Sequence, residues 1–441
     1  MFARAFLAST AIVGTGFALP AMAQTIPPAP VRQSVDPNGV DLFLGTVNVD
    51  GPALTAGAAG SPSISYYNVF RGSAFADSVT ARFYISGSTV TISFGTESDR
   101  FTVSGTTYRS TEGSGATLTY NATTTIYSYT TSSGVVYHFK NQWGTNGAQG
   151  GVADIVYPSG RTLTYTYQQF VRCKTHLLDD PSTCTQYVAS YALSKVVSND
   201  GYELDFNREG DTDEFPGQFL GVSMKNTVSG STTVRSQTYD DQSIDGTVQI
   251  TDQMSRLTKY RFSLAGVVGI THPGRTAEDV TIIYDTSNRA ASVTNPVGTT
   301  TYGYADSAGV RTTTVTDPGG HSTVYTFDIA SQRMLSITNP LSKTVSKQYD
   351  TSGRLTRVTA PEGNYTQYTY DARGNVTETR TVAKSGSGLA DIVTAAGYDT
   401  TCANTATCNS PNWIRDAIGN QTDYTYGADF SQTREGICRQ E

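Results

Sequence analysis

The residues with the greatest potential for chemistry are aspartates that follow aromatic residues at regular intervals. Carboxylates of this kind could be taken for catalytic groups or metal ligands. One catalytic site suffices for an enzyme, however, whereas an aspartate that opens a turn accepts hydrogen bonds from the backbone two residues on. We therefore interpret these aspartates as turn formers. The pairs are Tyr284-Asp285, Phe327-Asp328, Tyr349-Asp350, Tyr370-Asp371 and Tyr398-Asp399.

Other candidate catalytic or metal-binding groups are scattered through the sequence. No histidine stands at metal-ligand spacing from another histidine, a cysteine or a carboxylate. The acidic stretch 211–214 lacks the pattern of a calcium-binding loop, and no phosphate-binding glycine loop or nucleophile elbow occurs. We expect no catalytic residues, cofactor or metal ion, and therefore no enzyme. The histidines are His138, His176, His272 and His321.

The five cysteines predict two short disulfide-closed loops. Cys173 with Cys184 and Cys402 with Cys408 are the simplest local pairs, which leaves Cys438 odd. A zinc site would need Cys-x-x-Cys spacing or nearby histidine, and neither pair has it. Disulfides also require an oxidising compartment.

The N-terminus predicts export. Residues 1–23 combine a positive start, an apolar stretch and the small-x-small site Ala21-Met22-Ala23, which is typical of a cleaved signal peptide. An uncleaved anchor is the alternative. No later segment is apolar enough to span a membrane as a helix, so we expect none in the mature chain. We expect a periplasmic, cell-surface or extracellular location. A proline-rich linker over residues 24–38 follows.

Composition and patterning predict an all-β fold. The chain has 441 residues, of which only 16% are charged, with 42 glycines and 27 tyrosines. Short alternating runs between turn signals fill residues 39–133, which predicts an N-terminal β region. No segment has a convincing helical apolar stripe. The net charge of -7 is spread along the chain, which disfavours nucleic acid as a partner.

The aromatic-Asp pairs mark a tandem repeat. The aromatic positions, including Tyr304 and Tyr426 without the acid, are spaced 20 to 28 residues apart, a period typical of repeat architectures. Turns that contain proline, such as 295–298 and 339–342, lie between them. One unit is therefore strand, turn, strand, turn, and stacked units would bury the aromatic column. We place degenerate repeats with an inserted loop at 134–270, the main array at 271–427, and an irregular tail at 428–441.

The sequence resembles the RHS/YD-repeat family. This resemblance implies two-stranded repeats that form a long antiparallel β-sheet ribbon, or partial shell, in cell-surface proteins and in proteins that enclose a C-terminal toxin. Segment 35–41 also resembles what precedes the array in exported members. The resemblance rests on the motif Tyr349-Asp350-x-x-Gly353-Arg354-Leu355-x-x-Val358-Thr359-x-Pro361-x-Gly363-x-x-Thr366-x-Tyr368-x-Tyr370-Asp371. Gly374 takes the place of Gly353 in the following turn.

The departures from the family shape the functional hypothesis. No core segment of Asp-Pro-x-Gly type and no toxin domain follow Tyr426, so self-cleavage is not expected, and we interpret the chain as a short or truncated member. We expect a secreted, non-enzymatic scaffold in cell-surface contact, adhesion or interbacterial competition. The alternatives are a carbohydrate-binding module of the cell envelope, and the N-terminal part of a larger toxin-enclosing protein. Cell-surface carbohydrate or another envelope protein is the expected partner, and the sequence leaves the oligomeric state open.

Overall fold

The computed structural model is all-β. It describes residues 34–56, 64–72, 74–95, 97–140, 149–173, 187–208, 219–226, 233–242, 246–404, 407–426 and 432–438. These residues form strands, turns and loops, and no helix occurs among them. The expected all-β fold class is confirmed.

One antiparallel sheet of 30 strands makes up most of the molecule. Its main part is a meander, in which each strand pairs with the next one along the chain. The strands of this meander are β10 (Thr117–Asn121), β11 (Ile126–Thr130), β12 (Val136–Lys140), β13 (Gln149–Val156), β14 (Thr162–Cys173), β15 (Tyr187–Ser198), β16 (Tyr202–Arg208), β17 (Phe219–Asn226), β18 (Thr233–Gln242), β19 (Thr247–Thr251), β20 (Leu257–Ser263), β21 (Gly266–Thr271), β22 (Val280–Tyr284), β23 (Ala290–Asn295), β24 (Gly298–Ser307), β25 (Val310–Thr316), β26 (Ser322–Asp328), β27 (Met334–Thr338), β28 (Thr344–Tyr349), β29 (Leu355–Thr359), β30 (Tyr365–Tyr370), β31 (Val376–Val382), β32 (Ile392–Tyr398), β33 (Pro411–Arg415), β34 (Gln421–Tyr426) and β35 (Gln432–Cys438).

A second meander branches from this sheet at β13. It consists of β6 (Ala81–Ser86), β7 (Thr89–Phe94), β8 (Glu97–Ser104) and β9 (Thr107–Ser110). Strand β13 pairs with β6 over residues 149–151 and with β14 over residues 154–156, while β12 pairs with its other edge. The fork at β13 therefore holds the two meanders together as one sheet.

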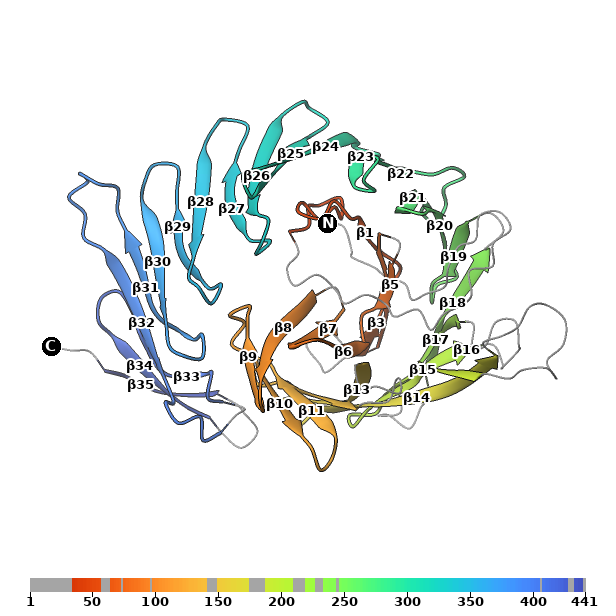
Figure 1. Cartoon of the computed structure of the whole chain (residues 1–441), viewed down its shortest axis with the longest axis horizontal. Helices are drawn as coiled ribbons and strands as arrows, with labels where there is room; N and C mark the ends of the chain where they lie inside the picture. Colours follow the sequence, from red (N-terminus) through yellow and green to blue (C-terminus); the bar gives the residue numbers. More distant parts are fainter. Residues whose placement is uncertain are drawn as a thin grey trace.

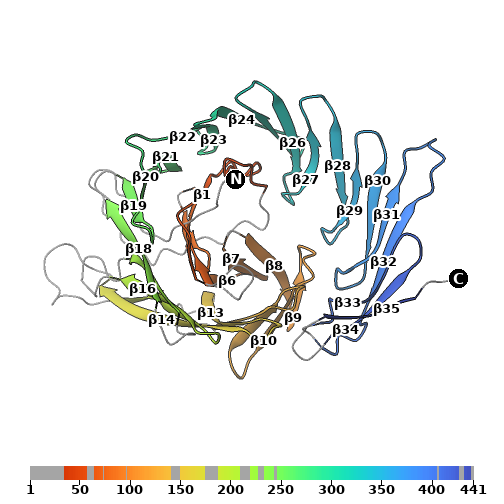
Figure 2. The same ribbon diagram turned by 180° about the vertical axis from the view of Figure 1, so that it is seen from behind.

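Five short strands lie inside the arc that the long sheet makes (Figure 1). Seen from behind, the same strands remain enclosed (Figure 2). They form a three-stranded sheet in the order β1-β4-β5 and a hairpin of β2 and β3. Their bounds are β1 (Asn48–Asp50), β2 (Leu54–Ala56), β3 (Ile64–Tyr66), β4 (Asn68–Arg71) and β5 (Ala74–Asp77).

Period-two alternation explains why one face of the long sheet is buried. Successive side chains in a strand point to opposite faces, and in β20 Thr258, Tyr260 and Phe262 are buried while the residues between them are exposed. Tyr260 and Phe262 both pack on Phe70 of β4, with ring centroids 4.7 and 4.6 Å apart. The apolar face of the array thus turns inward onto the enclosed N-terminal strands.

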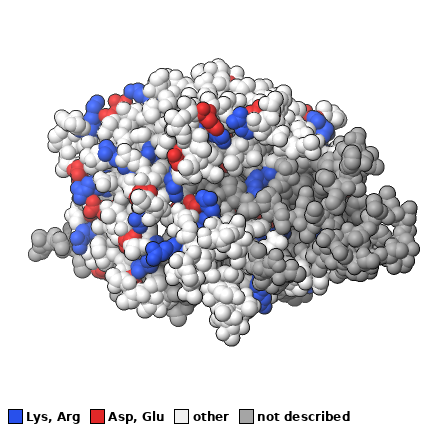
Figure 3. All heavy atoms as spheres, viewed as in Figure 1, with Lys and Arg blue, Asp and Glu red and all other residues white. Residues whose placement is uncertain are grey.

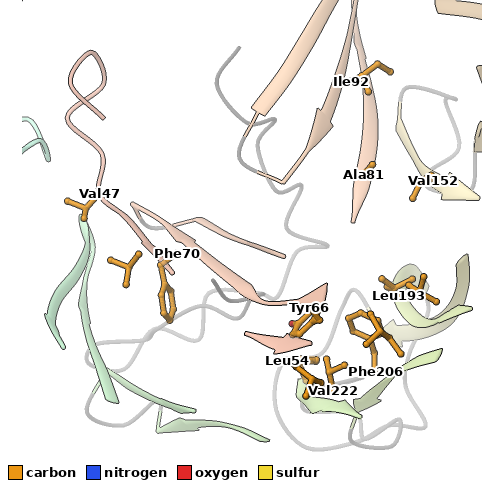
Figure 4. Close-up of a cluster of buried hydrophobic side chains, with 14 of the residues drawn as sticks. Val47, Leu54, Tyr66, Phe70, Ala81, Ile92, Val152, Leu193, Phe206 and Val222 are labelled. Carbon is orange, nitrogen blue, oxygen red and sulfur yellow. The ribbon is translucent and has the colours of Figure 1, made fainter. Parts of the chain in front are cut away.

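The N-terminal segment supplies the core on which the first part of the array closes. Leu54 and Tyr66 face Phe206 and Val222, which come from β16 and β17 (Figure 4). Tyr66 and Phe206 meet edge to face with ring centroids 5.3 Å apart. Burial of each large apolar side chain stabilises the fold by about 1.5–3 kcal/mol. A sheet with one apolar face needs such a partner layer.

Burial declines along the array. The aromatic column was expected to pack as a core, but of its Tyr-Asp members only Phe327 is fully buried, where it contacts Phe43 of the N-terminal segment at 5.7 Å between ring centroids. Tyr349, Tyr370 and Tyr398 are half-buried. The column is therefore fully buried only at Phe327, and Tyr284 is half-buried as well but packs against the buried core.

Several expected segment types differ from the structure. Residues 34–38, expected to belong to a linker, lie against β24. Residues 432–438, expected to be irregular, form β35 and pair with β34. Strands β10 and β11 fall in the segment assigned to the N-terminal β region but join the array. Alternation predicts a strand without specifying which sheet it joins.

Some expectations fall on parts of the chain outside the described residues. These are the signal peptide, most of the proline-rich linker, His176, the acidic stretch 211–214, and Cys184 with its expected bond to Cys173. Within the residues that the structure describes, no helix is long and apolar enough to cross a membrane.

Phe70 tests the role of the N-terminal layer. We expect Phe70→Ala to lower the free energy of unfolding by about 3–5 kcal/mol, because it empties a fully buried site between two array side chains. Urea unfolding followed by tyrosine fluorescence measures the change. Leu264→Ala is the control, because Leu264 is 89% exposed and should contribute little. Equal effects of the two variants would contradict this account.

Asp41 makes the N-terminal layer sensitive to pH. Its side chain is fully buried, and burial raises its pKa from 3.8 to about 6 despite hydrogen bonds from the Leu44 and Phe43 amides. A carboxyl whose pKa is raised by folding favours the folded state only while protonated, so stability is lost as pH rises from about 4 to about 6.

We expect the stability of wild type relative to Asp41→Asn to fall by about 2–3 kcal/mol between pH 4 and pH 7, since each pKa unit corresponds to about 1.4 kcal/mol. The asparagine keeps an oxygen for both amides but does not ionise. Parallel urea titrations of the two proteins measure the difference. A difference that stays constant with pH would refute the role of Asp41.

Candidate functional site

The Tyr-Asp turns form a row along one edge of the array, and Asp350 shows their construction. Its Oδ1 accepts hydrogen bonds from the amides of Ser352 at 3.0 Å and Arg354 at 2.8 Å. Its Oδ2 accepts one from Arg354 Nε at 2.7 Å. Backbone hydrogen bonds close the turn, and Gly353 occupies its fourth position with φ of 80°. Glycine adopts this left-handed conformation without a steric penalty.

The same construction recurs at Asp371 with asparagine in place of arginine. Asp371 Oδ1 accepts hydrogen bonds from the amides of Arg373 and Asn375, both at 2.9 Å. Asn375 Nδ2 donates to Oδ2 at 2.8 Å, and Gly374 closes the turn with φ of 92°. The turn therefore needs an acceptor first and a donor fifth, whether or not the donor is charged.

The remaining Tyr-Asp turns vary this plan. Asp285 accepts hydrogen bonds from the Ser287 and Arg289 amides and from Arg289 Nε. Asp328 opens a longer turn and accepts hydrogen bonds from the amide and hydroxyl of Ser331.

Hydrogen bonding favours the ionised form of the Asp350 and Asp399 carboxylates. Burial raises the pKa of Asp350, but the hydrogen bonds from the backbone and side chain of Arg354 prevail and hold its pKa below 3.8. Hydrogen bonds from the hydroxyl and amide of Thr401 likewise lower the pKa of Asp399. A general acid or base works best with a pKa near the operating pH. Asp350 and Asp399 are therefore suited to structure and poorly suited to proton transfer.

Five tyrosines at the aromatic positions each link their own strand to the preceding one, whereas the hydroxyl of Tyr304 is buried without a hydrogen-bond partner among the described residues. The hydroxyl of Tyr349, at the end of β28, donates to the carbonyl of Met334 at the start of β27 at 2.9 Å. Tyr370 repeats this bond to Leu355 at 2.6 Å. The same backward bond recurs for Tyr284 to Val267, Tyr398 to Val376, and Tyr426 to Pro411. These tyrosines thus form a ladder of hydrogen bonds between adjacent strands, and their rings add apolar surface.

Arginines that follow the turns link each repeat to the next one. Arg354 lies over the ring of Tyr370, 4.9 Å from its centroid, and donates to the carbonyl of Asp371 at 2.8 Å. Arg333 lies over Tyr349 at 5.7 Å and donates to the carbonyl of Gly353 at 3.1 Å. Cation–π contact of this kind contributes about 0.5–1 kcal/mol at exposed sites. Arginine therefore reaches forward while tyrosine reaches back.

The turn after Tyr398 is enlarged and closed by the expected disulfide. Cys402 and Cys408 are bonded, with their Cα atoms 4.7 Å apart. The guanidinium of Arg373, in the preceding turn, donates to the carbonyls of Asp399, Thr400 and Cys408. The longer loop thus keeps the forward contact from the previous repeat.

The contacts between the N-terminal segment and the array were not predicted from the sequence. Asp36 Oδ2 accepts a hydrogen bond from the Tyr302 hydroxyl at 2.6 Å, and Asn38 is hydrogen-bonded to both Tyr302 and Asn295. Thr313 donates to the carbonyl of Leu42 at 2.6 Å. Residues 35–41 resemble segments that precede such arrays, and this was the available signal. The resemblance does not indicate which residues of the array the segment contacts.

A turn of the same type in the degenerate region, opened by Asp252, was not predicted either. Asp252 accepts hydrogen bonds from the amides of Met254 and Arg256 and from Arg256 Nε. Its signal was the Asp-x-x-x-Arg spacing, obscured because Ser255, with φ of 59°, takes the place of glycine.

The histidines that the structure describes pair with aspartates. His138 Nδ1 lies 2.6 Å from Asp154, and His272 Nδ1 lies 2.9 Å from Asp279. His321 occupies the fifth position of a turn opened by Asp317. Among the described residues, no group of three histidines, cysteines or carboxylates could hold a metal ion.

Comparison with known proteins identifies one repeat directly. Residues 349–385 match the family model described as RHS Repeat, which covers the turns at Asp350 and Asp371. No curated protein matches the chain.

Solved structures of low similarity were also found. The crystal structure of TcdB2-TccC3 without its hypervariable C-terminal region has 11% identity and a TM-score of 0.41 and aligns with 86% of this chain. The Photorhabdus luminescens Tc holotoxin pore has 10% identity and a TM-score of 0.29 and aligns with 85% of this chain. The present chain covers 21% and 24% of those two chains.

Variants of Asp350 test the turn. We expect Asp350→Ala to destabilise the protein by about 1–3 kcal/mol, because two turn amides and the guanidinium lose their acceptor. Asp350→Asn should cost less, because its oxygen still accepts from both amides. Urea unfolding of both variants at pH 7 measures this order.

The pH dependence gives a further check on Asp350. Its pKa is lowered in the folded state, so its contribution is present above pH 4 and is lost as pH falls below that value. The destabilisation by Asp350→Ala should therefore shrink on acidification. An effect that grows at low pH would contradict the turn's electrostatic description.

Proposed function

We propose that this chain, which carries an RHS repeat at residues 349–385, is a non-enzymatic scaffold that acts outside the cytoplasm in cell-surface contact, adhesion or interbacterial competition. The observation that carries the proposal is the use of the repeated polar groups. The carboxylates of Asp350 and Asp371 hold their own turns together, and Arg354 links the first turn to the second through the carbonyl of Asp371.

The distribution of charge supports a protein or glycan partner over nucleic acid. On the face shown in Figure 3, Lys and Arg are interspersed with Asp and Glu. Ion pairs such as Lys343 with Glu362 and Arg261 with Glu278 offset the charges locally. A nucleic acid would require a continuous basic surface. The signal-like N-terminus supports export.

A cell-binding experiment tests adhesion. Fluorescently labelled full-length protein is added to bacterial cells, and bound protein is measured by flow cytometry. We expect wild type to bind, and the double variant Tyr349→Ala with Tyr370→Ala to lose most binding, because it removes two adjacent rungs of the ladder.

Leu264→Ala, on an exposed turn outside the Tyr-Asp row, should bind as wild type does. Folded wild-type protein that binds no cells would contradict an adhesive role. Undiminished binding by a folded double variant would show that the array does not present the adhesive surface.

An aromatic group on β9 to β11 favours carbohydrate recognition as a second candidate. Tyr120 is 42% exposed, and its ring lies 4.5 Å from that of Tyr127, which Tyr108 meets edge-on. Affinity chromatography on cell-wall polysaccharide tests it, with Tyr120→Ala expected to elute early. Identical elution of Tyr120→Ala and wild type would exclude this group as the sugar-binding surface.

A further inference from the structure

The loop 111–116, between β9 and β10, lies against the row of Tyr-Asp turns. A Cβ on Gly113 would fall 2.5 Å from Arg354 Cγ and 3.0 Å from the carbonyl oxygen of Ser352. A Cβ on Gly115 would fall 3.2 Å from the carbonyl oxygen of Arg373. The loop therefore touches two successive turns of the array at close range.

An ion pair connects the same loop to a third turn. Glu112 Oε2 lies 3.6 Å from Arg333 Nη2, and Glu112 Oε1 accepts a hydrogen bond from Arg100 Nε at 3.0 Å. The Glu112 and Arg333 side chains are only 8% and 13% exposed. Arg333 also donates to the carbonyl of Gly353, so Glu112 is connected through it to the next turn.

These contacts join two parts of the sheet that are distant in sequence. The loop belongs to the N-terminal strands held at the fork of β13, whereas the turns belong to β26 through β31. Figure 1 shows the array curving round until these turns approach β9. Among the strands of the described chain, no pairing links β9 or β10 to β27 through β31. Side chains and close backbone approach therefore make this closure.

The glycines suit the loop to this position. Gly113 and Gly115 have φ of 66° and 73°, a region that side chains rarely adopt. A Cβ on Gly113 would also clash with Arg354, and one on Gly115 would require its neighbours to shift slightly. Either requirement alone would favour glycine. Together they indicate that the loop conformation fits the surface of the Tyr-Asp turns.

We propose that loop 111–116 is a latch that closes the curved sheet into a ring. Its contact with three Tyr-Asp turns holds β27–β35 against the N-terminal strands. Its release lets these strands move away and exposes their half-buried inner face. Segments held by few buried contacts open more readily than those in continuous hydrogen-bonded ladders, so this junction is the place where the ring opens.

Two glycine variants separate the latch contact from backbone strain. Gly113→Ala places a methyl group against Arg354 and Ser352. Gly105→Ala is the matched control, because Gly105 has φ of 61° in the turn between β8 and β9 and nothing lies within 4 Å of its Cβ position. Hydrogen exchange of the full chain, followed by mass spectrometry, reports on the array turns.

We expect Gly113→Ala to speed exchange of amides in the turns 350–354 and 371–375 at least tenfold. Exchange in β16 through β20 should remain as in wild type, which also shows that the variant folds. Gly105→Ala should leave the array turns unchanged. Small-angle scattering should show a larger radius of gyration for Gly113→Ala alone.

Glu112→Gln provides a second test with little change in shape. It removes the charge that faces Arg333 and should speed exchange at the same turns. Wild-type exchange at these turns in both Gly113→Ala and Glu112→Gln would overturn the proposal. Faster exchange at these turns in Gly105→Ala as well would also overturn it, because opening would then follow from general strain.

Discussion

Coupling between neighbouring Tyr-Asp turns is the constraint on which the array depends. Tyr370 donates backward to the strand that begins at Leu355, while Arg354 reaches forward over Tyr370 to the turn at Asp371. A single two-stranded unit could not satisfy both contacts. Stability therefore arises between units as much as within them, as in other repeat proteins, and this coupling makes the array extended and continuous.

Coupling between the turns does not cover the apolar face of the sheet, and the N-terminal segment covers part of it. An antiparallel sheet with one apolar face must cover that face. Phe70, Tyr66 and Phe43 provide the cover along β16 through β26, whereas later units have only their neighbours. The gradient from fully buried Phe327 to half-buried Tyr349 follows from where this inner layer ends.

The structural use of the polar groups in the turns also bears on function. Asp350 and Asp371 direct their carboxylates into their own turns, and their neighbouring arginines serve the next repeat. The hydrogen bonds of these side chains therefore stabilise the array. Loop 111–116 and the exposed ring of Tyr120 lie outside the row, and the proposed movement and carbohydrate recognition are assigned to them.

Local patterns in the sequence were sufficient to predict the all-β class, the repeat, the turns opened by Asp350 and Asp371, and the Cys402–Cys408 bond. These depend on contacts between residues close in the chain, which alternation and turn signatures encode. Three long-range contacts became known from the folded chain alone: residues 34–43 lie against β24 and β25, β6 pairs with β13, and Gly113 lies against Arg354. Such contacts depend on the twist between adjacent strands, which accumulates over the sheet and brings its later strands back to the first ones. No local pattern of residues specifies this accumulated twist.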